Sequence, residues 1–124
     1  QLNKNITFLG ERKDIANILS ISDIGLLTSH EEGFSNSVLE MMSSSLPVIL
    51  TDVGGNAEAI DNFSGILVNS KDIKNLSSAI LHLINNKNQS IEMGKLANLR
   101  VKEKFDLKYT IEKYEDMYKK LNNC

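Results

Sequence analysis

Two glutamates at a spacing of eight residues are the positions in this chain best suited to chemistry. Glu32 stands in a glycine-containing turn, and Glu40 stands in the apolar-periodic segment that follows it. Ser35 or Asn36 is expected to cap a helix there, which places Glu40 about one turn in, roughly 5–6 Å along the axis. Helical side chains lean toward the N-terminus, so the Glu40 carboxylate would reach back toward the turn.

The backbone N–H groups at the start of this helix are hydrogen-bond donors that stand beside the two carboxylates. The free N–H groups of residues 34–38 point toward the turn, where the helix dipole is positive and suits a pyrophosphate. Glu40 can accept two charge-assisted hydrogen bonds from a vicinal diol such as the 2′ and 3′ hydroxyls of a ribose. Glu32, beyond the amides, would face whatever lies on the far side of the phosphates. Ribose, phosphates and sugar in that order match a nucleotide diphosphate sugar.

The surrounding segments predict a frame of strands and helices. Short apolar or β-branched runs predict strands, and apolar residues at helical spacing predict the helices between them. Strand–helix alternation followed by helices alone is typical of an α/β domain with a parallel sheet. The expected strands lie near 6–9, 24–28, 48–51 and 66–68, the expected helices cover about 14–20, 36–44 and 56–61, and a helical tail spans 72–121.

The helical tail is expected to hold three helices. Asp72 would cap the first, the asparagine-rich stretch 85–88 would end it, and amphipathic helices over 91–104 and 107–121 would follow. The apolar side chains of the last helix are expected to pack inward: Ile111, Tyr114, Met117, Tyr118 and Leu121.

Three short motifs stand around the glutamates in a fixed order. They are Glu-Gly-Phe at 32–34, Leu-Pro-Val at 46–48 and Asp-Val-Gly-Gly at 52–55. In this order they resemble the nucleotide-sugar site of GT-B glycosyltransferases, in the large retaining family that includes sucrose synthases and bacterial mannosyltransferases. The resemblance covers residues 5–68 in good register and continues more loosely to the end. It implies a partial Rossmann-like, doubly wound parallel sheet, the C-terminal half of a GT-B domain, with a C-terminal helical tail.

The resemblance also implies roles for individual residues. Glu40 would hold the donor ribose. Glu32 would contact the transferred sugar near the reacting centre and would be the catalytic residue. The remaining donor-binding positions that it implies are Gly33, Phe34, Ser35 and Asn36 on the turn, Gly10 and Glu11 beside the base, and Gly54 and Gly55 lining the cleft.

The implied activity is transfer of a hexosyl unit from a UDP- or GDP-sugar to a hydroxyl of a glycan or lipid-linked acceptor, with retention of the anomeric configuration. The resemblance implies no metal ion and no other cofactor. A non-catalytic nucleotide-sugar-binding subunit that acts with a partner chain is the alternative. A receiver-type signalling domain is a third interpretation, but it needs an acidic pocket and a lysine-bearing loop that the sequence does not place.

Departures from the family pattern set further expectations. Residues 1–124 are expected to be part of a C-terminal nucleotide-sugar-binding domain, without the upstream part of that domain and the N-terminal acceptor domain, and inactive alone. Strand 6–9 would then be separated from strand 24–28 by an empty slot in a sheet of order 3-2-1-4-5-6.

Arg12 and Lys13, with Lys4, are the upstream cations that could offset the charge of a pyrophosphate. Ser45 stands where relatives carry glycine after the helix, at a cost of up to ~1 kcal/mol if its backbone is left-handed.

Composition restricts the remaining classes. A net charge of −2 and a pI near 5.7 argue against a nucleic-acid or membrane-surface role, which normally needs a basic face. No stretch approaches the ~18 apolar residues of a transmembrane helix. Cys124 is the one cysteine, so no internal disulfide can form. We therefore expect a cytoplasmic protein, with peripheral contact at the inner membrane face left open for the full enzyme.

Overall fold

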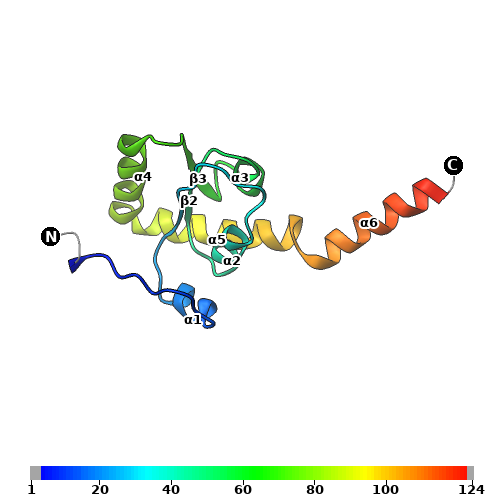
Figure 1. Ribbon diagram of the computed structural model, residues 1–124, viewed down its shortest axis with the longest axis horizontal. Helices are drawn as coiled ribbons and strands as arrows, with labels where there is room; N and C mark the ends of the chain where they lie inside the picture. The colour runs from blue at the N-terminus through cyan, green and yellow to red at the C-terminus, as the bar shows by residue number, and fades with distance from the viewer. Residues whose placement is uncertain (1–3, 123–124) are drawn as a thin grey trace.

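A three-stranded parallel sheet lies at the centre of the chain. The computed structural model describes residues 4–122, apart from the side chains at 107, 109, 110, 118, 121 and 122. The strands are β1 (Gly25–Leu27), β2 (Val48–Thr51) and β3 (Gly65–Val68), in the order β1-β2-β3. Gly25 pairs with Val48, and Val48 pairs with Gly65. This confirms the expected α/β class with a parallel sheet (Figure 1).

The helices alternate with these strands and then follow one another. The chain forms α1 (Ile15–Ser20), α2 (Asn36–Ser43), α3 (Asn56–Ala59), α4 (Ile73–Asn85), α5 (Lys87–Lys104) and α6 (Leu107–Asn122). The third helix is shorter than expected, and the fifth begins earlier than expected, directly after the break at Asn86. Asp72 caps α4 as predicted, because its carboxylate accepts the Asn75 N–H at 3.0 Å.

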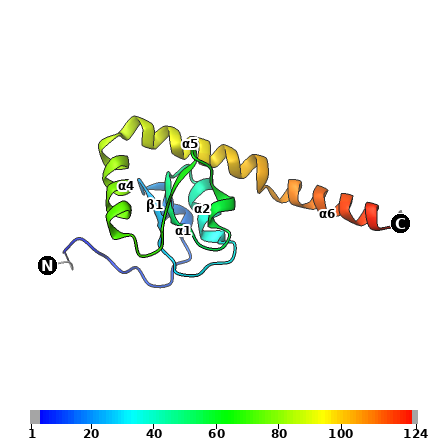
Figure 2. The ribbon, with the colours of Figure 1, turned by 90° about the horizontal axis from the view of Figure 1, so that it is seen from above.

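The central strand separates two apolar clusters. All four residues of β2 are buried, and successive side chains of a strand point to opposite faces. Val48 and Leu50 pack with α2 and the middle of α5, whereas Ile49 packs with α4 and the start of α5. α2 and α4 thus cover opposite faces of the sheet, as Figure 2 shows from above. A strand buried on both faces reads as a continuous apolar run, which is what 48–50 carries.

The end of α2 is fixed by a turn with a left-handed residue. Ser45 has φ 59°. Its N–H reaches the Met42 carbonyl at 3.0 Å, and the Leu46 N–H reaches the Met41 carbonyl at 3.2 Å, the bond pattern of a Schellman motif. Asn98 of α5 donates to the Ser43 carbonyl at 2.6 Å. The left-handed backbone considered for Ser45 is therefore present.

Replacing Ser45 with glycine is expected to stabilise the fold by about 0.5–1 kcal/mol, because glycine reaches positive φ without a steric cost. Ser44, whose φ is −83°, provides the matched control. Ser44→Gly should destabilise, since it only adds freedom to the unfolded chain. Urea unfolding of the two variants measures both effects, and a Ser45→Gly variant less stable than the wild type would contradict this account.

An arginine from α5 closes the far end of α3. Arg100 donates to the Ala59 carbonyl at 2.7 Å, to the Glu58 carbonyl at 3.0 Å and to the Asp61 carboxylate at 3.1 Å. Burial raises the pKa of Asp61, but hydrogen bonds from the Ser64 hydroxyl and the N–H groups of Phe63 and Ser64, with the charge of Arg100, outweigh it. The net result is a lowered pKa for Asp61.

This lowered pKa predicts an acid-sensitive contribution to stability. The folded-state pKa of Asp61 lies below its unfolded value of about 3.9. The contribution is therefore complete above pH ~4 and is lost as the pH falls through the folded-state pKa. Asp61→Asn should remove this part of the pH dependence, whereas Asp116→Asn on exposed α6 should keep it. Urea unfolding between pH 2.5 and 6 measures the difference; equal pH slopes for the two variants would contradict it.

The first expected strand does not form. Residues 6–10 form neither a helix nor a strand, and Phe8 is 94% exposed. A strand is stabilised by a hydrogen-bonded neighbour, and among residues 4–122 the sheet holds only β1, β2 and β3. The predicted strand at 6–9 is therefore wrong for this structure, whereas the predicted gap is not contradicted, because residues 6–9 do not pair with β1. Figures 1 and 2 show this segment outside the compact body.

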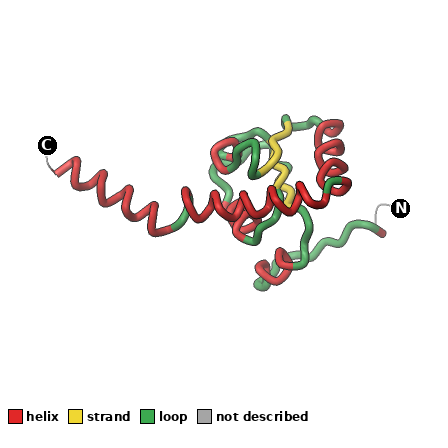
Figure 3. Tube along the Cα trace, turned by 180° about the vertical axis from the view of Figure 1, so that it is seen from behind, coloured by secondary structure: helices red, strands yellow, loops and turns green. Residues whose placement is uncertain are grey.

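The last helix extends away from the sheet. α6 continues the direction of α5 beyond the body in Figures 1 and 3. Ile111, Tyr114 and Met117 are each about half exposed, so the expected inward packing of this face is wrong where the side chains are described. The side chains of Tyr118 and Leu121, and all of Cys124, lie outside the described residues.

Candidate active site

The loop between β1 and α2 carries the first group of predicted site residues. It leaves the carboxyl end of β1, the edge at which open α/β sheets bind ligands. Ser35 stands at the N-cap of α2 with an extended backbone, at φ −87° and ψ 120°. Its side chain makes no capping hydrogen bond. The N–H groups of the first turn of α2 are therefore available to an anionic ligand, as the sequence predicted.

Glu32 is held within this loop by a neighbouring hydroxyl. Ser29 donates to Oε1 of Glu32 at 2.7 Å, and both side chains are half-buried. A hydrogen bond to a charged acceptor is stronger than one between neutral groups. This hydrogen bond therefore holds the carboxylate in a defined position. Ser29 was not among the predicted site residues, although its place three residues before Glu32 is within reach for such a bond.

The glycine pair at the end of β2 lies directly against the Glu32 loop. Gly55 donates its N–H to the Gly33 carbonyl at 2.9 Å. Gly54 has φ 52°, and a Cβ there would overlap the backbone oxygen of Glu32. A Cβ at Gly55 would lie 3.0 Å from the Phe34 ring. The structure thus brings Glu32, Gly33 and Phe34 together with Gly54 and Gly55, and only glycine permits this close approach.

Two buried polar residues at the end of β2 complete this junction. Thr51 is 5% exposed and donates its hydroxyl to the Ser29 carbonyl at 2.7 Å. Asn56, the first residue of α3, is 1% exposed and donates to the Thr51 carbonyl at 2.9 Å, while its own Oδ1 has no hydrogen-bond partner among the described residues. Sequence reasoning missed both residues. The signal for Thr51 was a hydroxyl at the end of an otherwise apolar strand, where it can meet the neighbouring strand end.

Glu40 lies on a different side of α2 from this junction. Its side chain is exposed and lines a hollow of 510 Å³ between α1, α2 and the end of α5. The remaining lining is mainly apolar and includes Ile15, Leu39 and Phe105. Phe105 also packs against Phe34, with ring centroids 5.2 Å apart. The end of α5 therefore supports both the turn after Glu32 and the surface beside Glu40.

A third loop joins the same edge of the sheet. Nδ1 of His30 lies 3.1 Å from Oγ of Ser70, which follows β3. A hollow of 150 Å³ lies beneath this contact, lined in part by Thr28, Thr51 and Lys71. The loops after all three strands are therefore connected at the carboxyl edge. His30 is thus an exposed residue that joins the loop after β1 to the loop after β3.

The predicted base-side residues and the upstream cations are not brought to this junction. Gly10 and Glu11 are exposed in the extended N-terminal segment, and a Cβ at Gly10 would meet no atom within 4 Å. Arg12 forms a two-bond ion pair with Asp14, at 2.8 and 2.7 Å. The bond raises the pKa of Arg12 and lowers that of Asp14. Asp14 precedes α1 as expected, but its side chain bonds Arg12 and does not cap the helix.

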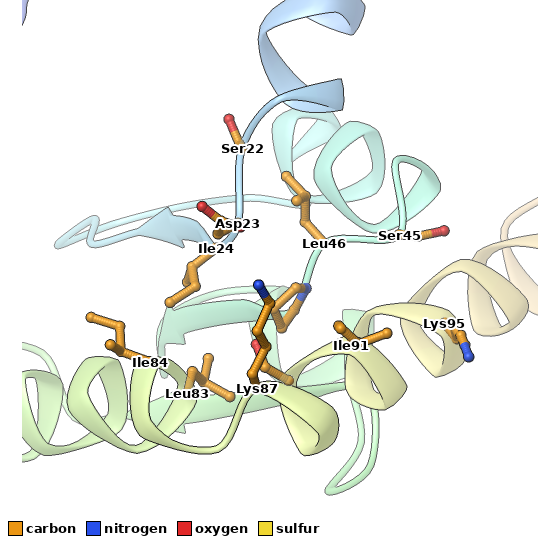
Figure 4. A pocket seen from close by; sticks show the side chains of 12 residues that line it. Ser22, Asp23, Ile24, Ser45, Leu46, Leu83, Ile84, Lys87, Ile91 and Lys95 are labelled. Atoms are coloured by element: carbon orange, nitrogen blue, oxygen red, sulfur yellow. The ribbon is translucent and has the colours of Figure 1, made fainter.

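A hollow of 590 Å³ at the opposite edge of the sheet does not match the predicted chemistry. Figure 4 shows Lys87 extending into it from α5, between Ile24 and Ile91. It lies at the amino ends of β1 and β2 and contains neither predicted glutamate. Open α/β sheets bind ligands at the carboxyl ends of their strands, so we place the site at the Glu32 junction.

The described part of the chain offers neither a metal site nor a membrane-spanning helix. Within it, no three His, Cys, Asp or Glu residues are grouped closely enough to hold a metal ion. Nor does any described helix have both the length and the apolar character needed to cross a membrane.

Comparison with known proteins identifies related chains. The family described as Glycosyl transferases group 1 matches residues 1–86. A UDP-Gal:alpha-D-GlcNAc-diphosphoundecaprenol alpha-1,3-galactosyltransferase from Escherichia coli is 33% identical over 118 residues, which cover 94% of this chain. A glycosyltransferase structure from Rickettsia africae is 28% identical with a TM-score of 0.89, over 96% of this chain and 32% of that one. A mutant of Staphylococcus aureus TarM, in complex with Fondaparinux, alpha-GlcNAc-glycerol and UDP, is 28% identical with a TM-score of 0.84, over 94% of this chain and 24% of that one.

The match is confined to part of each relative. The chain spans 30% of the length of the galactosyltransferase and 31% of the length of an N-acetyl-alpha-D-glucosaminyl L-malate synthase from Bacillus anthracis. Only the portion of these proteins that corresponds to residues 4–122 can therefore be compared with the site described above.

Proposed function

Because the chain belongs to the glycosyl transferases group 1 family, we propose that the carboxyl edge of its sheet binds the nucleotide diphosphate sugar of a glycosyl transfer. In this proposal residues 1–124 are part of the C-terminal nucleotide-sugar-binding domain of a longer retaining enzyme. The observation that carries it is the placement of two carboxylates on either side of the open N-terminus of α2, one fixed and one exposed.

The geometry supports a direction for the donor. Glu40 lines a hollow of 510 Å³, within the range of about 300–1,000 Å³ that small-molecule sites occupy. It would accept hydrogen bonds from the ribose hydroxyls there, as two charge-assisted bonds. The diphosphate would then lie at the first turn of α2, where backbone N–H groups and the helix dipole favour negative charge. The transferred sugar would reach the junction of Glu32 with Gly54 and Gly55.

The junction supports a role for Glu32 in the chemical step. A carboxylate fixed before the donor arrives needs little reorganisation when positive character develops on the sugar ring. It would also orient the sugar by accepting a hydroxyl hydrogen bond. Retention of configuration and the hexosyl nature of the transferred unit come from the family resemblance. Both are part of the proposal on the basis of that resemblance. Glu32 is not assigned as a nucleophile.

The names of the relatives support one class of donor and acceptor. One relative is a transferase that uses UDP-Gal and a diphosphoundecaprenol acceptor, and one related structure contains UDP. We accordingly propose a UDP-sugar, with a GDP-sugar as the alternative, and a glycan or lipid-linked hydroxyl as acceptor. A lipid-linked acceptor would place the enzyme at the cytoplasmic face of a membrane. We further propose that the transfer needs no metal ion.

The test is donor turnover by the full-length protein. We would incubate it with UDP-glucose, UDP-galactose or GDP-mannose and an alpha-D-GlcNAc-diphosphoundecaprenol acceptor, with and without EDTA, and measure transfer of the sugar to the acceptor hydroxyl with release of the nucleoside diphosphate. The proton coupling constant at the anomeric carbon of the product reports whether configuration is kept. Release that is insensitive to EDTA, with the anomeric configuration retained, is expected. Inversion would overturn the retaining assignment, and no release from any donor would overturn the proposed function.

A further inference from the structure

The Glu32 carboxylate is controlled by a residue that lies outside the two-glutamate motif. Ser29 donates its hydroxyl to Oε1 of Glu32 at 2.7 Å. Among the described residues no hydrogen bond engages Oε2. The two carboxylate oxygens of Glu32 therefore have different surroundings, and Oε2 can accept a further hydrogen bond.

Ser29 is itself fixed by the neighbouring strand end. The Thr51 hydroxyl donates to the Ser29 carbonyl at 2.7 Å, a far better distance than the 3.5 Å to the Leu27 carbonyl. Thr51 is buried, and its own carbonyl accepts a hydrogen bond from Asn56 at 2.9 Å. A short chain of hydrogen bonds therefore runs from the buried end of β2 to the Glu32 carboxylate. Such supporting contacts limit the positions that a functional side chain can adopt.

We propose that Ser29 is a positioning residue that holds Oε1 of Glu32 and presents Oε2 to a hydroxyl of the transferred sugar. This inference rests on the proposed function. Ser29 would act through Glu32 alone, because its side-chain hydrogen bond within the described residues goes to Glu32 and not to Glu40 or the first turn of α2. The nucleotide half of the donor should therefore not sense its removal, whereas the sugar half should.

The expected effects separate binding from turnover. In the full-length protein, Ser29→Ala should lower kcat for nucleotide release from UDP-glucose, UDP-galactose or GDP-mannose by about 10-fold to 100-fold, the effect of losing a hydrogen bond to a charged group. The Kd for UDP or GDP alone should change less than about twofold, since only the sugar side is affected. Ser77→Ala, at an exposed serine on α4, is the control and should change neither value.

A pair of variants tests the hydroxyl itself. Ser29→Thr keeps the hydroxyl and Ser29→Val replaces it by a methyl group of nearly the same shape. Thr should restore most of the wild-type kcat and Val should not. If circular dichroism shows that Ser29→Ala is unfolded, the Thr and Val variants still decide whether the hydroxyl is needed. Equal kcat for Thr, Val and wild type would overturn the inference.

A double-variant cycle distinguishes this inference from the proposed function. If Ser29 acts only through Glu32, adding Ser29→Ala to Glu32→Gln should cause no further loss. A Glu32→Gln variant with wild-type kcat would contradict the proposed role of Glu32. An impaired Glu32→Gln variant beside an unimpaired Ser29→Ala variant would contradict only the positioning role. A crystal structure of Ser29→Ala gives a readout without turnover: a changed Glu32 rotamer is expected, and an unchanged carboxylate would overturn the inference.

Discussion

Gly54→Ala is expected to lower the free energy of unfolding by about 2 kcal/mol or more and to weaken donor binding. Two independent costs add at this position. A side chain at φ 52° adopts a left-handed backbone, which costs about 1–2 kcal/mol for a non-glycine residue. The new Cβ would also overlap the backbone oxygen of Glu32, and backbone atoms cannot move aside as a flexible side chain can. The contact between the two loops would have to open.

Gly33 provides the matched control for this change. It lies on the opposing loop, has no positive φ, and a Cβ there would meet no atom within 4 Å. Gly33→Ala should therefore leave the free energy of unfolding nearly unchanged, although it stands in the proposed donor site. Urea unfolding of both variants makes the comparison. If the two glycines tolerate alanine equally, the close docking of the two loops is not present in solution.

Glu32→Gln in the full-length protein is expected to reduce transfer by about 10²-fold or more, since it removes a fixed negative charge beside the reacting sugar. The amide has nearly the same shape as the carboxylate, so the loop should remain folded. The affinity for UDP or GDP should stay close to that of the wild type, because the nucleotide is held elsewhere in the proposed site. Nucleotide release from the donor gives kcat, and calorimetric titration gives Kd.

Glu31 is the natural control for this charge change. It precedes Glu32, is exposed, and its side chain forms no hydrogen bond or ion pair within residues 4–122. Glu31→Gln should therefore transfer at the wild-type rate. A similar loss in both variants would show that net loop charge matters and not the position of Glu32. Wild-type transfer by Glu32→Gln would remove Glu32 from the chemical step.

The sheet and the donor loops were predictable from local sequence signals. A continuous apolar run indicated β2 because that strand is buried on both faces. Apolar spacing indicated α2 and α4, and Asp72 marked the start of α4. The Glu32 turn and the glycine pair, both predicted to belong to one site, lie in contact because they follow neighbouring parallel strands and therefore meet at one edge. Their roles in donor binding remain predictions.

The errors and omissions arise where the structure depends on which partner a residue or segment finds in the folded chain. The run at 6–9 has strand propensity, but a strand also needs a neighbour, and no described strand pairs with it. Arg12 was expected to offset the donor charge, but a nearby carboxylate at Asp14 engages it. Ser29 and Thr51 were missed because their importance comes from a hydrogen bond between two strand ends, which no single segment reveals.

We propose that Glu40 and Glu32 act on opposite halves of one nucleotide sugar. A titration of the full-length protein is the most direct test of this arrangement. UDP, GDP and their sugars would be titrated into wild type, Glu40→Ala and the exposed α5 control Glu103→Ala. Losing two charge-assisted bonds should weaken nucleotide binding about 10-fold to 100-fold in Glu40→Ala, with the control unchanged. Saturable nucleotide binding that Glu40→Ala leaves intact, in a variant with an unaltered circular dichroism melt, would contradict the account.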